Sequence, residues 1–122
     1  MYLEPKDKEE TFTLNSIYFI QSTATIKDES YESLDLIVNV LKKNQLLKMK
    51  ISGHTDNVGE EKSLIKLSLE RALAIKDYLV KTGNIDPKRI VAEGKGKSEP
   101  LNDNSTEEKK SKNRRVEFTV YK

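Results

Sequence analysis

The chain has 122 residues, of which 35% are hydrophobic and 34% charged, a balance that indicates one compact domain with a modest core. Its 22 basic and 20 acidic side chains are interspersed and leave a net charge of +2, which argues against nucleic acid as a partner because no dominant basic face results. Cysteine is absent, which excludes a disulfide framework and a thiolate metal site. No apolar run approaches the roughly 18–20 residues that span a bilayer, so we expect no membrane insertion by this domain.

The N-terminal segment 1–10 is charged, contains Pro5 and lacks periodicity, so it is interpreted as a linker or tether end. The domain itself is expected to occupy residues 11–122. Residues 11–19 are rich in Thr, Phe, Ile and Tyr, which predicts a strand. The parity of the apolar positions changes near Asn15 and predicts a break there.

Two amphipathic helices are predicted next, separated by a strand. Apolar residues recur at helical spacing within 28–44, with Asp28 as the expected N-cap. Alternating apolar residues within 47–51 predict a strand that leads into the sequence GHTDNVG. The helical spacing returns within 72–79, and Gly83 is placed to end that helix as a left-handed C-cap.

The C-terminal part of the chain adds two strands, predicted within 90–92 and within 116–120. Between them lies a long polar stretch, 94–112, with room for one helical turn at 106–110. The order β-α-β-α-β-loop-β predicts an α/β (α+β) two-layer sandwich, in which helices cover one face of a small mixed sheet.

Two motifs with possible chemistry are weak. Gly96, Lys97 and Ser98 spell the end of a phosphate-binding loop, but the position that needs the first glycine is Val91. His54 is the only histidine, which excludes a multi-histidine zinc site, and no nucleophile elbow accompanies it. These observations favour a flexible turn for the first motif and a structural hydrogen-bonding role for His54.

Asp56 and Arg71 form a more informative pair. Asp56 follows a strand, and Arg71 falls in the first turn of a helix if Ser68 caps it, where the helix dipole disfavours a cation. One explanation is a salt bridge between Asp56 and Arg71. The other is a ligand that presents an ammonium to the aspartate and a carboxylate to the arginine and the helix end.

A family resemblance rests on six stretches that occur in a fixed order and spacing. They are GHTDNVG, LSLERA, YLVKTG, DPKRIVAEGKG, PLNDNST and NRRVEF. Together they resemble the OmpA-like C-terminal domain family, which includes OmpA, the peptidoglycan-associated (Pal) lipoproteins and the flagellar stator protein MotB. The resemblance covers residues 11–120 and implies a periplasmic domain of an outer-membrane or envelope-associated protein, which binds peptidoglycan non-covalently through a βαβαβ(α)β sandwich.

The resemblance also implies the ligand and its contacts. In the family the aspartate of GHTD and the arginine of LSxxRA clamp the amino and carboxylate groups of diaminopimelate in the stem peptide, and these positions are Asp56 and Arg71. Secondary contacts are implied at Thr55, Asn57, Leu67, Ser68, Ser22 and Arg114. For Arg114, a role in pinning its loop is equally open. No cofactor, metal or catalytic residue is implied.

The chain departs from the family pattern at four positions. FIQSTA stands where members often carry FDFDSA, so Ile20 replaces an acid and Ser22 occupies the polar contact position. Leu64 replaces an asparagine, and Lys95 replaces the tyrosine of GYG. These changes leave the aspartate and the arginine in place and concern the shape of the remaining pocket.

Three hypotheses for function follow. The leading one is a non-enzymatic anchor that grips diaminopimelate in the cell wall. The alternative is an OmpA-like scaffold that docks a protein partner in a secretion, motility or stator assembly, which the departures at Ile20, Ser22 and Leu64 motivate. A cell-wall hydrolase is disfavoured because neither a zinc set nor a nucleophile with its base is present. The sequence does not indicate an oligomeric state.

Overall fold

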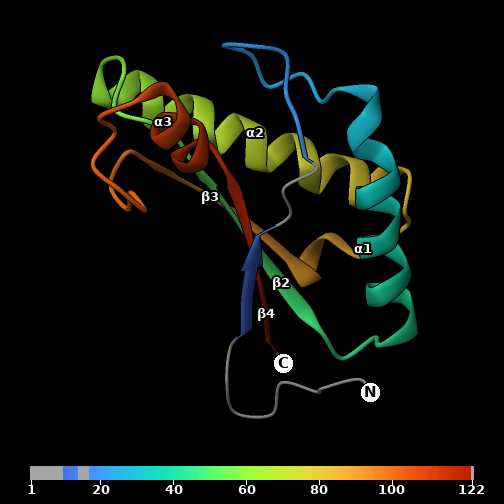
Figure 1. Ribbon diagram of the computed structural model, residues 1–122. Helices are drawn as coiled ribbons and strands as arrows, with labels where there is room; N and C mark the ends of the chain where they lie inside the picture. The colour runs from blue at the N-terminus through green and yellow to red at the C-terminus, as the bar shows by residue number, and fades with distance from the viewer. Residues whose placement is uncertain (1–9, 14–16, 122) are drawn as a thin grey trace.

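The computed structural model describes residues 10–13 and 17–121 of the chain, which alternate between strands and helices (Figure 1). In chain order the elements are β1 (Glu10–Thr13), the 3₁₀ turn η1 (Asp28–Ser30), α1 (Tyr31–Lys43), β2 (Lys48–His54), α2 (Glu61–Lys81), η2 (Pro87–Arg89), β3 (Ile90–Gly96), α3 (Glu107–Asn113) and β4 (Val116–Tyr121).

The strands form one mixed sheet in the order β1-β4-β2-β3. β4 pairs antiparallel with both β1 and β2, whereas β2 and β3 are parallel. The parallel pair requires a crossover connection, and α2 supplies it. In the shared register Ile51 of β2 lies between Phe118 of β4 and Ala92 of β3. The last strand in sequence therefore lies inside the sheet, beside the strand that ends in the GHTD motif.

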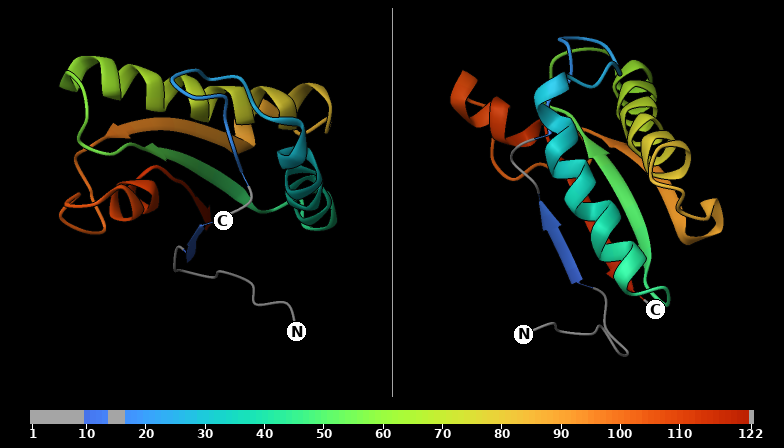
Figure 2. Two further views of the ribbon diagram at one scale, coloured as in Figure 1. Left: turned by 45° about the horizontal axis from the view of Figure 1, so that its top comes forward. Right: turned by 90° about the vertical axis from the view of Figure 1, so that its right-hand side faces the viewer.

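The core lies between the sheet and the two long helices (Figure 2). Alternate residues of β2 and β4, among them Ile51 and Phe118, are fully buried against apolar residues of the helices, such as Leu34 of α1 and Ile75 of α2. α3 lies at the end of the molecule where α2 begins. The predicted α+β sandwich is confirmed.

Glycines allow α2 to approach the strands unusually closely. A Cβ atom on Gly53 of β2 would lie 2.3 Å from the carbonyl oxygen of Ser68, and one on Gly94 of β3 would lie 2.5 Å from the amide nitrogen of Leu69. Only glycine permits such an approach of two backbones. This contact fixes α2 beside the end of β2, and it places Arg71 opposite the loop that carries Asp56.

Several predicted boundaries are corrected. The strand predicted over 11–19 is shorter, because β1 ends at Thr13 and Phe19 instead forms an isolated bridge with Ile26; residues 14–16, where the break was predicted, lie outside the described residues. Asp28 does not cap α1, because it begins the 3₁₀ turn that precedes the helix. Residues 1–9 of the predicted linker also lie outside the described residues, so the linker remains a prediction.

The prediction that Gly83 is a left-handed C-cap is wrong. The left-handed residue after α2 is Asn84, with a φ of 58°. Gly83 is instead required by crowding, because a Cβ atom there would lie 2.6 Å from the carbonyl oxygen of Leu79 and 2.7 Å from Val38. The glycine therefore lets the end of α2 pack against α1.

Candidate ligand-binding site

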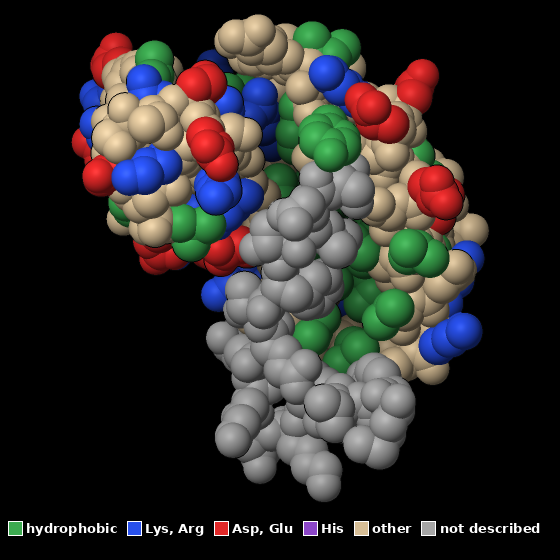
Figure 3. Space-filling model, in the orientation of Figure 1, with side chains coloured by type: hydrophobic (Ala, Val, Ile, Leu, Met, Phe, Trp, Pro, Cys, Tyr) green, Lys and Arg blue, Asp and Glu red, His purple; other side chains and the backbone are tan. Residues whose placement is uncertain are grey.

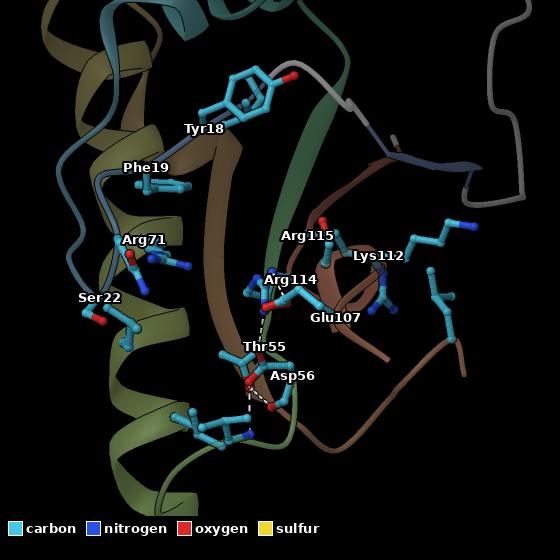
Figure 4. Close-up of a pocket in the computed structure, with 17 residues that line it drawn as sticks. Tyr18, Phe19, Ser22, Thr55, Asp56, Arg71, Glu107, Lys112, Arg114 and Arg115 are labelled. Carbon is cyan, nitrogen blue, oxygen red and sulfur yellow. Dashed lines mark hydrogen bonds and ion pairs between the residues drawn. The ribbon is translucent and has the colours of Figure 1, made fainter. Parts of the chain in front are cut away.

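A cavity of about 1120 Å³ opens where β2 ends. Its walls come from five places: the segment 17–22, the loop after β2, the first half of α2, Leu101 in the loop before α3, and α3 with the two residues that precede β4. Figure 4 shows that Asp56 and Arg71 lie on different walls, one from the loop after β2 and the other from α2. The cavity therefore joins segments that are far apart in sequence.

Asp56 is held in place by its neighbours. It is only 8% exposed, and its Oδ1 accepts a hydrogen bond from the amide of Val58 at 2.9 Å. Its Oδ2 forms an ion pair with Nη1 of Arg114 at 2.5 Å, and Nη2 of the same arginine binds Glu107 at 3.1 Å. The Asp56 carboxylate is thus partly neutralised by Arg114, which pins the loop after β2 to α3.

Arg71 occupies the α2 wall and has no carboxylate partner among the described residues. Its Nε donates to the carbonyl of Thr23 at 2.8 Å, and its guanidinium carbon lies 4.9 Å from the centre of the Phe19 ring. Burial and the nearby charge of Arg114 lower the pKa of Arg71, and Asp56 only partly offsets them. Its charge is therefore under-compensated.

The structure corrects the reasoning that singled out this arginine. α2 begins at Glu61, so Ser68 lies inside the helix and is not its cap, and Arg71 is well beyond the first turn. The helix dipole therefore does not act on Arg71, since its effect falls off within one turn. The alternative salt bridge between Asp56 and Arg71 is also not formed; Arg114 takes that place.

The remaining predicted site residues divide into two groups. Thr55, Leu67, Ser22 and Arg114 line the cavity with Asp56 and Arg71. Asn57 is exposed and does not line the cavity. Ser68 is fully buried; its hydroxyl donates to the carbonyl of Ile65 at 2.8 Å and accepts from the amide of Gly96 at 3.0 Å. Ser68 thus connects α2 to the end of β3.

Of the four positions that depart from the family pattern, some line the cavity and others do not. Ile20 is 48% exposed and does not line the cavity, whereas Leu64 does. Lys95 lies within 4 Å of carboxylate oxygens of Glu93 and Glu99 and does not line the cavity either. Of these positions, Ser22 and Leu64 are therefore the ones that can change the shape of the pocket.

Some lining residues were not anticipated from the sequence. Phe19 supports Arg71 but reads as an ordinary strand residue. Lys112, Arg115 and Glu107 come from the polar stretch around α3, whose composition gives no sign that it folds back over the end of β2. Phe19 can be assigned to the cavity only once it is known that the segment before α1 passes beside α2.

The cavity carries an excess of positive charge. Its lining includes four cations, Arg71, Lys112, Arg114 and Arg115, against two carboxylates, Asp56 and Glu107. In Figure 3 basic side chains gather in the hollow beside the α3 region. An anionic group is therefore favoured in this cavity, with Asp56 as the complementary position for a cation.

Other kinds of site receive no support from the described part of the chain. It holds no group of three His, Asp or Glu side chains that could bind a metal ion. None of its helices is both long and apolar enough to cross a membrane.

The fold and the cavity together define an α+β domain with a charged cavity at the end of β2. Comparison with known proteins identifies it further, because the profile of the OmpA family matches residues 18–114. The chain belongs to the OmpA family.

Named relatives and a solved structure agree with this assignment. The chain is 36% identical to outer membrane protein A of Bordetella avium, over 96% of this chain and 62% of that protein. It is 38% identical to the peptidoglycan-binding protein ArfA of Mycobacterium tuberculosis, over 85% of this chain and 32% of that protein. The cell wall anchor of the type VI secretion system (T6SS) from Pseudomonas aeruginosa matches with a TM-score of 0.76 and 31% identity, over 93% of this chain and 80% of that one. The chain thus spans from about a third to three fifths of these two curated relatives.

Proposed function

We propose that this chain is a non-covalent peptidoglycan-binding domain that anchors a larger envelope protein to the cell wall in the periplasm. Asp56 and Arg71 hold the zwitterionic end of diaminopimelate in the stem peptide, the aspartate receiving its ammonium and the arginine its carboxylate. Binding of this kind needs neither a cofactor nor a covalent step.

The observation that carries the proposal is the state of Arg71. Its guanidinium lines the cavity, has one carbonyl partner, and lies near Arg114 without a carboxylate of its own among the described residues. A ligand carboxylate would satisfy its remaining N–H groups with charge-assisted hydrogen bonds, which are about twice as strong as neutral ones. The under-compensated charge of Arg71 therefore favours an anionic group on the α2 wall.

The ammonium half of the ligand fits Asp56. An ionised carboxylate offers about four lone-pair sites, and the described contacts of Asp56 to Val58 and Arg114 use two of them. An ammonium can therefore bind Asp56 without displacing either partner. The positive charge of Arg114 nevertheless weakens the attraction, so the ammonium contact is the weaker half of the clamp.

The relatives support the envelope setting. They are named as an outer membrane protein, a peptidoglycan-binding protein and a cell wall anchor. This chain matches only part of the first two, which fits the proposal of a domain that anchors a larger envelope protein. The departures at Ser22 and Leu64 affect the part of the pocket beyond the clamp, where they set the preference among peptide variants.

The affinity of one site is expected to be modest. Each charge-assisted hydrogen bond contributes roughly 1.5–3 kcal/mol when partly desolvated. Two or three of them, after the ligand has lost its freedom of motion, give an affinity between about micromolar and millimolar. Many such sites on one polymer then hold the protein by avidity.

A second candidate function is the docking of a protein partner. The ion pair between Asp56 and Arg114 favours it, because it neutralises one half of the clamp within the domain itself. In that case the basic lining of the cavity receives acidic side chains of another envelope protein. The wild-type domain would then bind such a partner and would not bind purified cell wall.

The test is co-sedimentation of the purified domain with diaminopimelate-containing sacculi, compared with sacculi whose stem peptides carry lysine. Lysine in the stem presents an ammonium without the adjacent carboxylate, so the proposal predicts pelleting with the first material and little with the second. Free meso-diaminopimelate should release the bound domain. Equal pelleting with both kinds of sacculi contradicts a zwitterion clamp.

The variants for this test are Arg71→Ala and Asp56→Asn, with Lys66→Ala as the matched control. Lys66 is an exposed cation on the same helix as Arg71 and does not line the cavity. Each variant is checked by thermal melting. The proposal requires a strong loss of pelleting for Arg71→Ala, a smaller reduction for Asp56→Asn and normal pelleting for Lys66→Ala. If the wild-type domain itself stays in solution, the docking function replaces the anchoring function.

A further inference from the structure

The cavity is larger than the proposed clamp needs. Its volume of about 1120 Å³ lies at the upper end of the roughly 300–1,000 Å³ of pockets that enclose a drug-sized ligand, so the zwitterionic end of one residue fills only part of it. Apolar side chains also line the walls, and the most exposed of these are Val58, at 59%, and Leu101, at 62%. Contact of either side chain with an apolar group of a ligand would remove apolar surface from water and is therefore favourable.

Val58 lies in the loop after β2 and is held in place by the clamp itself. Its amide donates to Oδ1 of Asp56 at 2.9 Å, and Oδ2 of Asp56 is ion-paired with Arg114. The loop that carries Val58 is therefore fixed at the aspartate, and its exposed side chain has a defined place on the cavity wall.

Leu101 lies in the loop before α3 and is held by a buried asparagine. Its amide donates to Oδ1 of Asn113 at 2.7 Å, and Asn113 is fully buried. Nδ2 of Asn113 donates to the side-chain oxygens of Asn102 and Asn104, at 2.9 Å in each case. The stretches PLNDNST and NRRVEF thus meet at Asn113, and together they fix Leu101 on the cavity wall.

A continuous set of contacts joins the two apolar side chains through the clamp. The amide of Val58 and the guanidinium of Arg114 both bind Asp56. Arg114 directly follows Asn113, which holds the amide of Leu101. Because both loops are positioned before a ligand arrives, contact with Val58 and Leu101 costs little additional ordering.

We propose that Val58 and Leu101 form an apolar rim that contacts an aliphatic side chain of the stem peptide, on the residue that is joined to diaminopimelate. The clamp recognises the zwitterion, which is the same whatever residue is joined to it. The rim adds to the preference set by Ser22 and Leu64, because it favours a peptide whose next residue carries aliphatic carbon atoms. This inference rests on the proposed function, which places the ligand in the cavity.

The experiment compares ligands that differ by one methyl group. In each ligand, one end of meso-diaminopimelate is acetylated at its amine and joined through its carboxyl group to alanine amide or glycine amide, while the other end stays zwitterionic. Alanine is used in both configurations. Calorimetry on the wild-type domain should give an affinity about threefold to fourfold higher for one of the alanine ligands than for the glycine ligand, which is the effect of one buried methylene group, about 0.8 kcal/mol.

The variants are Val58→Ser and Leu101→Ser, with Leu46→Ser as the matched control, each checked by thermal melting. Leu46 is 69% exposed and does not line the cavity. The measured quantity is the ratio of the affinities for the alanine and glycine ligands within each variant, so a general change in affinity does not alter it. We expect a ratio near one for both rim variants and the wild-type ratio for the control.

Methyl NMR on the wild type tests the same contact without a substitution. The methyl resonances of Val58 and Leu101 should shift more with the preferred alanine ligand than with the glycine ligand. The methyl resonances of Leu46 should respond equally to both ligands.

Two results overturn the inference: equal affinities of the wild type for the alanine and glycine ligands, or a preference for alanine that persists in both rim variants. Either result leaves the proposed function intact, because the ligands still bind through their zwitterionic ends. If the wild type binds neither these ligands nor free meso-diaminopimelate, the proposed function fails, and the rim fails with it as part of that site.

Discussion

The two sides of the cavity differ in how far the charge of their ionised side chain is compensated by neighbouring groups. On the loop after β2, Asp56 is buried, hydrogen-bonded to the amide of Val58 and ion-paired with Arg114. On α2, Arg71 is held by a carbonyl group and an aromatic ring, and burial and Arg114 both work against its charge. The aspartate is thus already compensated within the protein, whereas the arginine is not.

This contrast indicates which half of a zwitterionic ligand contributes more to the binding affinity. A carboxylate that reaches Arg71 relieves an unfavourable charge, while an ammonium that reaches Asp56 must share it with Arg114. The contacts of the arginine with Thr23 and Phe19 also fix its direction before the ligand arrives, which reduces the entropy lost on binding. We therefore expect the arginine wall to dominate affinity and the aspartate wall to contribute selectivity.

The largest effect is expected from Gly53→Ala, which forces the two walls apart. Its Cβ would meet the carbonyl oxygen of Ser68 at 2.3 Å, so β2 and α2 cannot keep their present distance. We expect a loss of about 3 kcal/mol of unfolding free energy, measured by urea denaturation, together with loss of ligand binding. Ser63→Ala, at an exposed position of α2, serves as the control. An unchanged midpoint for Gly53→Ala would show that α2 can shift without cost.

Arg71→Ala tests the uncompensated wall directly. Removing the guanidinium should weaken binding of meso-diaminopimelate by about thirtyfold, or roughly 2 kcal/mol, measured by calorimetry. The unfolding free energy should change by less than about 1 kcal/mol, because burial and Arg114 already oppose the charge. Lys66→Ala should change neither quantity. A large loss of stability without a loss of affinity would make Arg71 a structural residue.

Much of this architecture was predictable from local patterns. Alternation in β4 and helical spacing in α1 located the core-facing residues, because those periodicities depend only on which face is buried. The sequence motifs also indicated Asp56 and Arg71, and the structure places both on one cavity. Their use as a clamp remains a prediction.

The partners of these residues were not predictable, because they depend on long-range packing. The contact between Arg71 and Thr23 joins positions 48 residues apart, and that between Asp56 and Arg114 joins positions 58 apart. The start of α2 was misplaced because Ser68 resembles a cap in sequence, yet α2 begins seven residues earlier, at Glu61, without a side-chain cap. No local pattern distinguishes a capping serine from a buried one that bonds to a neighbouring strand.

Ser68→Ala separates support of the walls from contact with the ligand. The hydroxyl accepts the buried amide of Gly96, and its loss leaves that amide without this partner. We expect a loss of about 1.5 kcal/mol of unfolding free energy and no more than a twofold change in affinity. Ser63→Ala, at an exposed position of the same helix, should change neither. A loss of affinity with full stability would return Ser68 to the group of direct ligand contacts.

Asp56→Asn should have the smallest effect on affinity, about fivefold or roughly 1 kcal/mol. The side-chain amide oxygen can still accept from Val58, so the loop keeps its turn, and only the charge that faces the ammonium and Arg114 is lost. Repeating the substitution in an Arg114→Gln background tests the two sides of the cavity on equal terms, because the Asp56 carboxylate is no longer shared with Arg114. The cost of Asp56→Asn should then approach that of Arg71→Ala, as measured by a double-mutant cycle. A cost that is the same in both backgrounds would mean that Arg114 only pins the loop and that the two walls recognise their halves of the ligand independently.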